Sequence, residues 1–144
     1  MEVLDRLIKF STIRPRTEFE VKRWLIRKKI EEKDSEVALS ELKKAQLIND
    51  ENFCRWWIEQ RTTFRPKAPK LLVLELLKKG VDKELARQIV GEADLNEEEL
   101  VWRLMEKKKK SWSKLEPETR KKKTIAFLAF RGFNWSVIKK YLKD

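Results

Sequence analysis

The sequence predicts an all-α protein made of three tandem three-helix repeats. Apolar residues recur at helical spacing, and no stretch alternates apolar and polar residues over the length of a strand. A motif also recurs, because Gly80-Val81-Asp82 is matched by Gly132-Phe133-Asn134, 52 residues later. Each triplet holds a glycine suited to ending a helix, an apolar residue, and a residue suited to starting the next helix. The chain has three glycines, so this arrangement indicates an internal repeat of about 50 residues. We place the repeats at residues 1–48, 49–94 and 95–144.

The first repeat has a proline and a capping pattern near its start. Pro15 ends the opening helix, since the residue before a proline is disfavoured in helical backbone. Thr17, with Glu20 three residues later, has the pattern of a capping box, in which side chains bond the free N–H groups of the first turn. Lys29 occupies the place that glycine has in the other repeats. Because lysine tolerates left-handed backbone less well than glycine, we expect a looser turn there.

The second repeat contains the most apolar helix of the chain. Asn49 or Asp50 is suited to cap its first helix. Pro66 and Pro69 cannot lie inside a helix, so a bend is expected around them. The run that follows, residues 71–77, is apolar at all but one position. This helix should therefore lie at the centre of a core.

The third repeat shows the same order of signals. Asn96, with Glu99 three residues on, is suited to start its first helix, and Pro117 suits the first position of its second helix. The connections between all these helices are short. We therefore expect a rigid, elongated and curved helical body in preference to a flexible two-domain protein.

Two details of the repeat are specific expectations for the structure. Leu25, Leu76 and Leu128 precede the three turns at spacings of 51 and 52 residues, so all three should be buried at equivalent positions. Gly80 and Gly132 should adopt positive φ, because each follows a basic helix end and precedes an apolar residue and an N-cap.

Composition limits the class of partner. Charged and hydrophobic residues each make up 41% of the 144 residues, the net charge is +11 and the pI is about 9.8. Such an excess favours a polyanionic partner, whether nucleic acid, a membrane surface or an acidic protein. No apolar run approaches the ~18 residues of a membrane span, and the N-terminus lacks a signal-peptide core. Cys54 is the single cysteine, so we expect no internal disulfide and a cytoplasmic location. We also expect a monomer.

The residue types that carry most enzymatic chemistry are scarce. The chain has no histidine, so one cysteine cannot build an ordinary zinc site. Its glycines stand far apart, which excludes a glycine-rich phosphate loop. The carboxylates alternate with Lys and Arg at helical spacing, as in solvated surface pairs. We therefore expect no enzyme activity, no metal and no cofactor.

Two basic clusters are candidate binding surfaces. The runs Lys107–Lys110 and Arg120–Lys123 flank Trp112, and a solvated face is the alternative interpretation. The second cluster surrounds the proline bend beside Phe64, and such a bend is suited to contact phosphate or an acidic partner. Among the six tryptophans, a place in the core is expected for Trp24, Trp57 and Trp135. Either core or interface suits Trp56, Trp102 and Trp112.

The second and third repeats resemble the RecX family of recombination regulators. LINDENF, beginning at Leu47, is similar to that family's start of a helix, EQRTTFRPK to its bend, and LLVLELLKKGVDKELARQIV to its central helix end. AFLAFRGFNWSVIKKYL is similar to the family's closing segment. The likeness covers roughly residues 17–142. It implies the family's fold of three tandem three-helix units, which agrees with the repeat found above.

The resemblance also implies a function and a partner. Members of the family bind the RecA–DNA filament in its groove and usually inhibit ATP hydrolysis, strand exchange and filament growth in recombination and repair. A filament groove offers phosphate and acidic protein surface, so a basic surface suits either contact. The residues expected to contact the filament through a basic concave face are Arg61, Arg65, Lys67, Lys70, Lys121, Lys122 and Arg131.

Direct binding of single- or double-stranded DNA is the alternative function. Each three-helix unit can imitate a helix-turn-helix, whose recognition helix should expose Arg, Asn or Gln. Arg87 with Gln88 is the nearest candidate. A pure scaffold is a third interpretation, but it would not need a net charge of +11.

Overall fold

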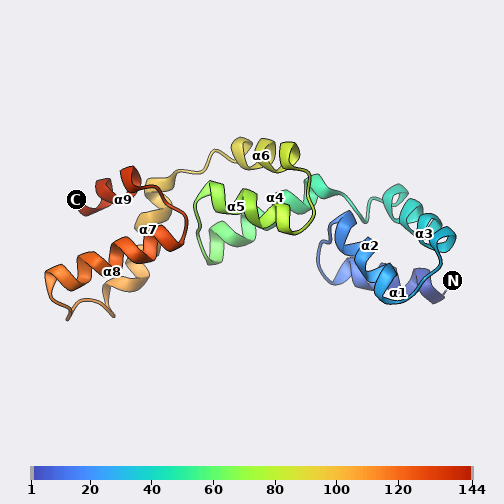
Figure 1. Ribbon diagram of the computed structural model, residues 1–144, viewed down its shortest axis with the longest axis horizontal. Helices are drawn as coiled ribbons and strands as arrows, with labels where there is room; N and C mark the ends of the chain where they lie inside the picture. The colour runs from blue at the N-terminus through green and yellow to red at the C-terminus, as the bar shows by residue number, and fades with distance from the viewer. Residues whose placement is uncertain (1, 144) are drawn as a thin grey trace. The chain divides into compact units, whose positions relative to one another are not determined.

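Nine α-helices make up the regular structure of residues 2–143, which are the residues that the computed structural model describes, and no strand occurs among them (Figure 1). The predicted all-α class is confirmed. The first three helices are α1 (Glu2–Ile13), α2 (Glu18–Arg27) and α3 (Glu32–Lys44). The next three are α4 (Asp50–Phe64), α5 (Pro69–Lys78) and α6 (Lys83–Glu92). The last three are α7 (Glu97–Lys109), α8 (Pro117–Phe130) and α9 (Trp135–Lys143).

Packing contacts gather these helices into two compact units. Unit 1 comprises the residues up to Trp57 together with Glu75–Ile89, and unit 2 comprises Ile58–Leu74 together with the residues from Val90 onward. Helices α4, α5 and α6 therefore contribute residues to both units. The repeat boundaries proposed from the sequence, and the elongated and curved outline, stay predictions.

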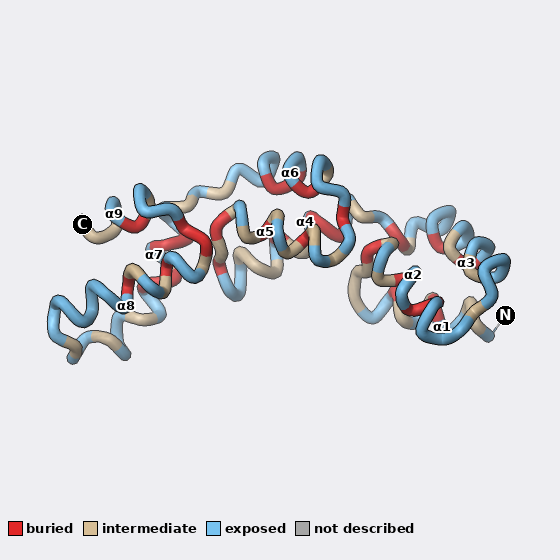
Figure 2. Tube along the Cα trace, viewed as in Figure 1, coloured by how far each residue is buried: buried red, intermediate tan, exposed pale blue. Residues whose placement is uncertain are grey.

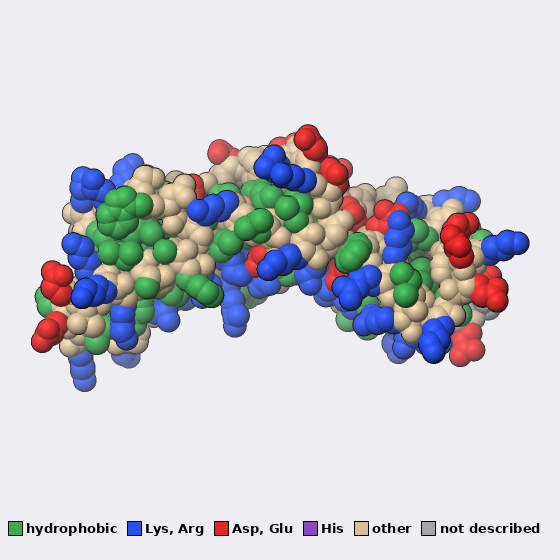
Figure 3. All heavy atoms as spheres, viewed as in Figure 1, with side chains coloured by type: hydrophobic (Ala, Val, Ile, Leu, Met, Phe, Trp, Pro, Cys, Tyr) green, Lys and Arg blue, Asp and Glu red, His purple; other side chains and the backbone are tan. Residues whose placement is uncertain are grey.

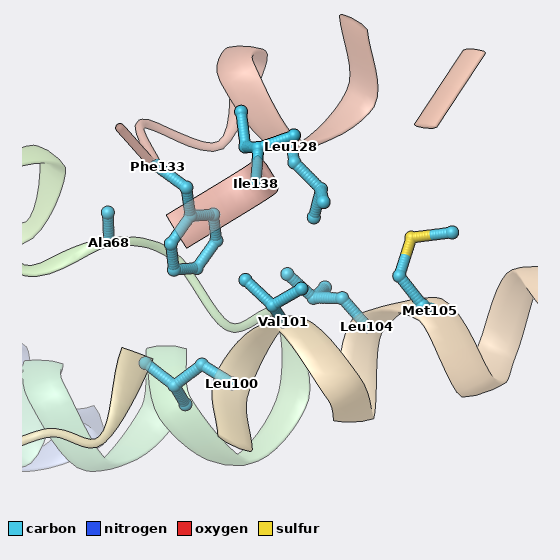
Figure 4. Packing of buried hydrophobic residues seen from close by; sticks show 8 residues of the cluster. All are labelled: Ala68, Leu100, Val101, Leu104, Met105, Leu128, Phe133 and Ile138. Atoms are coloured by element: carbon cyan, nitrogen blue, oxygen red, sulfur yellow. The ribbon is translucent and has the colours of Figure 1, made fainter. Parts of the chain in front are cut away.

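Each unit has its own apolar core. Buried and exposed stretches alternate along most helices (Figure 2), as expected when one face of a helix packs inward. In unit 1 the core joins α1, α2 and α3 through Leu7, Val21, Trp24, Leu25, Ala38, Leu42 and Ile48. In unit 2 it joins α7, α8, α9 and the bend before α5 through Ala68, Leu100, Val101, Leu104, Met105, Leu128, Phe133 and Ile138. Figure 4 shows the Phe133 ring pointing from the turn before α9 toward Val101 of α7.

The turns that end α2, α5 and α8 share one hydrogen-bond pattern. In each, the N–H three residues after the last helical residue donates to a leucine carbonyl five residues earlier, at 3.1 Å. The accepting leucines are Leu25, Leu76 and Leu128, which are 2%, 0% and 0% exposed, so their predicted burial is confirmed. This is the bond of a Schellman turn, which needs one residue in left-handed backbone. Gly80 and Gly132 occupy that place with φ of +86° and +91°, as predicted.

Lys29 forms the same turn without glycine. Its φ is +57°, its N–H donates to the Ile26 carbonyl at 3.0 Å, and the Ile30 N–H donates to Leu25 at 3.1 Å. The expectation of a looser turn is wrong, because both closing bonds are present. Gln46 ends α3 in the same way, also at φ of +57°.

In unit 1 the beginning of α2 lies against the end of α5. The predicted capping box is present, with Thr17 Oγ1 accepting from the Glu20 N–H at 3.1 Å and the Thr17 N–H donating to Glu20 Oε1 at 3.1 Å. The Thr17 hydroxyl in turn donates to the Lys79 carbonyl at 2.7 Å. A Cβ placed on Gly80 would lie 2.2 Å from the Cβ of Phe19. The positive end of one helix thus meets the negative end of another, which is a favourable arrangement.

A similar junction occurs in unit 2, between the beginning of α5 and the end of α8. The Ala68 N–H donates to the Arg131 carbonyl at 3.0 Å. A Cβ on Gly132 would lie 2.5 Å from Leu71 Cγ. This junction brings the proline bend, which carries most of the predicted binding residues, beside the turn that follows α8.

Candidate binding surface

Arg65 and Arg131 lie near one another at the junction in unit 2. Arg65 is exposed and lies in the bend before α5, whereas Pro66 beside it is buried. Arg131 is half-buried at the end of α8, and its guanidinium lies 5.1 Å from the centre of the Phe127 ring. Burial lowers the pKa of Arg131, and the nearby charge of Arg65 lowers this pKa further. Two positive guanidinium groups held near one another are suited to receive an anion between them.

Lys70 extends this positive region toward α9. It is exposed in the first turn of α5, and its Nζ donates to Asn134 Oδ1 at 2.8 Å. Asn134 lies directly before α9, so this bond fixes the lysine beside the turn that contains Gly132. Arg61 and Lys67, the other two residues predicted around the bend, are half-buried.

Two cations of α7 bond to the end of α4, directly before the bend. Arg103 donates to the Thr63 carbonyl at 3.3 Å, and Lys107 Nζ donates to the Phe64 carbonyl at 3.2 Å. Cations at the C-terminal end of a helix, here α4, are favourably placed in its dipole. Phe64 itself is 64% exposed. Arg103 was not predicted, because only folding brings it to a residue 40 positions earlier in the chain.

Five of these cations form what we call the bend surface, which consists of Arg65, Lys70, Arg103, Lys107 and Arg131. In the part of the chain that the structure describes, none of these five forms an ion pair with a carboxylate.

The bend before α2 in unit 1 offers a direct comparison. Arg14-Pro15-Arg16 stands 51 residues before Arg65-Pro66-Lys67. Arg14 pairs with Glu20 at 2.6 Å, and the position 51 residues after Glu20 is Leu71. The bend of unit 1 therefore neutralises its arginine, while the bend of unit 2 leaves Arg65 available to a partner.

Lys121 and Lys122 do not belong to the bend surface. They lie ten residues and nine residues before Arg131 in the sequence, which is about 15 Å along a helix axis. Lys121 lines a groove formed by α7, α8 and α9, and Lys122 is exposed. The predicted residues therefore fall into two groups on unit 2.

The tryptophans divide between core and surface. Trp24 is buried, and Trp57 is half-buried with its Nε1 donating to Glu75 at 3.0 Å. Trp56 is half-buried and contacts the Phe53 ring at 5.8 Å. Trp112 is half-buried and meets Phe127 edge to face at 5.9 Å.

Two tryptophans of unit 2 are exposed. The expected core position of Trp135 is wrong, because this residue is 54% exposed. It is the first residue of α9, where Phe133 and Ile138 already fill the core and leave Trp135 at its edge. Trp102 of α7 is 59% exposed, so of the two positions expected for this residue the core is excluded.

Within residues 2–143, no group of three metal-binding side chains comes together. None of the described helices combines the length and the apolar character needed to cross a membrane.

Comparisons with known proteins give one consistent family. The family model for the second three-helix domain of RecX matches residues 49–89, and the model for the third three-helix domain of RecX matches residues 96–142. The Regulatory protein RecX of Amycolatopsis mediterranei (strain U-32) is 34% identical over 137 residues, covering 92% of this chain and 78% of that relative. The Regulatory protein RecX of Chlorobium limicola is 32% identical over 132 residues, covering 92% of this chain and 82% of that relative.

Solved structures show the same fold. The crystal structure of RecX from Lactobacillus salivarius superposes with a TM-score of 0.80 at 23% identity, over 97% of this chain and 92% of the other. A second crystal structure, of regulatory protein RecX, gives a TM-score of 0.80 at 21% identity over 99% of this chain.

Proposed function

Because the chain belongs to the RecX family of regulatory proteins, we propose that it binds the RecA–DNA filament and lowers RecA activity through the bend surface. The observation that carries this proposal is the group of five cations without carboxylate partners in unit 2. The resemblance in sequence supplies the partner, and the surface supplies the chemistry that would hold it.

The chemistry of the bend surface suits a filament made of protein and nucleic acid. Arginine forms two parallel bonds with a phosphate or a carboxylate, so Arg65 and Arg131 suit both components. Lys70 and Lys107 act as point charges around them. Phe64, which is exposed and directly precedes Arg65, adds an apolar contact of the kind that anchors protein interfaces. The surface would block or reshape the filament by occupying it, with no chemical step.

A pair of charge-reversed variants tests this proposal. Arg65→Glu combined with Lys70→Glu should weaken binding to preformed RecA filament by at least about fivefold, because two screened contacts of roughly 0.5 kcal/mol each are lost and repulsion is added. Lys33→Glu with Lys44→Glu is the matched control, since both lysines are exposed on α3 and the net charge changes equally. Binding and RecA ATP hydrolysis should be measured together, with helicity checked by circular dichroism.

Two results would contradict the proposal. If the bend variant and the control lose binding equally, net charge and not the bend surface is responsible. If the unaltered protein binds bare DNA as tightly as filament and leaves RecA ATP hydrolysis unchanged, direct nucleic-acid binding replaces RecA regulation as the function.

A further inference from the structure

A groove in unit 2, away from the bend surface, combines positive charge with exposed aromatic rings. It has a volume of about 960 Å³ and lies between α7, α8 and α9. Its floor includes the buried side chains of Met105 and Thr124. Figure 3 shows hydrophobic side chains gathered over α9 with Lys and Arg side chains around them. Each of the two basic runs that flank Trp112 in the sequence contributes two residues to this groove, Lys108 and Lys109 from the first run and Arg120 and Lys121 from the second.

The groove is strongly basic. The cations that line it are Lys108, Lys109, Arg120, Lys121, Lys139 and Lys143, whereas Glu106 is its one carboxylate. Glu106 already pairs with Lys109, at 3.6 Å. Lys108 Nζ lies 5.5 Å from the Trp112 ring centre, which holds this charge over the aromatic wall. The excess of positive charge complements an extended polyanion.

Two indole rings stand exposed in the same groove. Trp102 is 59% exposed and Trp135 is 54% exposed, and both line the groove. Within the described part of the chain, neither ring stacks on another aromatic residue or donates a hydrogen bond. Exposed apolar surface that is rimmed by polar residues, as these two rings are, is typical of a ligand or interaction site. The polyanion that fits this groove should therefore carry flat apolar groups as well as charges.

We propose that this groove binds single-stranded nucleic acid, with bases stacked on Trp102 and Trp135 and phosphates held by the surrounding lysines. Single strands expose base faces that stack on aromatic side chains, and their backbone follows a basic groove. A duplex keeps its bases stacked on one another and would use the cations alone. An acidic peptide would likewise pair with the lysines and leave the indoles uncovered. Single-stranded nucleic acid uses both features.

The test needs no RecA, so its outcome is independent of the proposed function. A fluorescent oligothymidylate of about 12 nucleotides, a length within the range of single-strand sites, is titrated with the full chain and followed by anisotropy. An abasic oligonucleotide of equal length keeps the phosphates and removes the bases. The protein should bind oligothymidylate more tightly than the abasic strand. Trp102→Ala and Trp135→Ala should each weaken oligothymidylate binding by roughly tenfold, as expected when base stacking is lost.

Conservative and matched variants separate stacking from folding and from net charge. Trp102→Phe keeps an aromatic face and should retain most of the affinity. Lys139→Gln should weaken binding more than Lys123→Gln, because Lys139 lines the groove whereas Lys123 is exposed in the neighbouring basic run but does not line it. Circular dichroism should be unchanged in the tryptophan variants, since both rings are largely exposed.

Three results would overturn the inference. The first is equal affinity for oligothymidylate and the abasic strand. The second is unchanged affinity in both Trp→Ala variants. The third is tighter binding of an oligoglutamate of equal charge than of oligothymidylate, which would assign the groove to an acidic peptide.

Discussion

At Gly80 and Gly132 the backbone needs left-handed φ and also lacks room for a side chain. Gly80 has φ of +86°, and a Cβ there would lie 2.2 Å from Phe19. A Cβ on Gly132 would likewise lie 2.5 Å from the Cγ of Leu71. The two constraints have different origins, since the first belongs to the turn and the second to the helix packed against it. A residue that tolerates left-handed backbone, such as asparagine, would satisfy only the first.

Gly80→Ala should therefore destabilise the protein. Left-handed backbone costs an alanine about 1–2 kcal/mol, and displacement of Phe19 adds to this. Gly91→Ala is the matched control, because Gly91 lies inside α6 with nothing within 4 Å of the added Cβ. The control should gain about 0.5–1 kcal/mol, as usual for glycine to alanine in a helix. Denaturant unfolding measures both, and a stability loss confined to Gly91→Ala would contradict the explanation.

Cys54 is buried at 0% exposure, and burial raises the pKa of its thiol from 9.0 to about 11. The folded protein therefore holds this proton more tightly than the unfolded chain does. The stability that the neutral thiol contributes is present below pH 9 and is lost as pH rises toward about 11.

Native Cys54 should react slowly with a thiol reagent at pH 8 and rapidly once the protein is unfolded. Its contribution to the pH dependence is isolated by comparing the free energies of unfolding of the unaltered protein and of Cys54→Ala between pH 8 and 11. The unaltered protein should lose more stability over this range than the variant. If both proteins lose the same free energy of unfolding, the pKa of the Cys54 thiol is not raised in the folded protein. If the native protein is labelled rapidly at pH 8, the thiol is not buried.

Among the helices, the end of α2 is the one most open to improvement. Its closing turn has the same two hydrogen bonds as the turn after α5, but Lys29 holds it at φ of +57°. A lysine in left-handed backbone is strained relative to glycine. The turn persists because Leu25 is buried and Ile30 packs against the same core.

Lys29→Gly should stabilise unit 1 by about 0.5–1 kcal/mol, because relief of left-handed strain exceeds the extra entropy of glycine in the unfolded chain. The neighbouring Lys28→Gly is the control, since Lys28 has φ of −82° and caps the same helix. It gains nothing from glycine and should lose stability. Thermal unfolding compares the two, and an equal effect of both substitutions would show that the turn is not strained.

At the scale of the whole molecule, the positive charge of unit 2 is gathered on two distinct surfaces. The bend surface groups arginines and lysines beside one exposed phenylalanine, and the groove groups lysines around two exposed indoles. The net charge of +11 favours any polyanion from a distance, whereas these local groupings determine which part of the surface makes contact.

Filament binding should fall as salt rises, because contacts between exposed charges are screened and counterions are released from phosphate. The slope of log affinity against log salt concentration should be shallower for the double variant Arg65→Glu with Lys70→Glu than for the unaltered protein. The slope should fall in magnitude by about one for each phosphate contact removed. An unchanged slope in this variant would mean that neither residue contacts phosphate in the filament.

The sequence by itself determined the helices, their caps and the turns that join them. Each of these depends on residues within a few positions of one another: the capping box on Thr17 and Glu20, the turns on Gly80 and Gly132, and helical periodicity on the spacing of apolar side chains. Such signals are local, so they can be interpreted without knowing how the helices pack. The same reasoning placed Leu25, Leu76 and Leu128 in the core.

Only the tertiary structure decided which charged and aromatic residues share a surface. Arg65 and Arg131 lie near one another although 66 positions separate them in the sequence, and Arg103 reaches Thr63 across 40 positions. Trp135, expected in the core, lies exposed with Trp102 because Phe133 and Ile138 fill the space beneath α9. Lys121 belongs to a groove and not to the bend. Helical periodicity gives the face of a helix on which a residue lies. The neighbours of that residue in space depend on which helices pack together and in what register, and the packing of the whole core determines both.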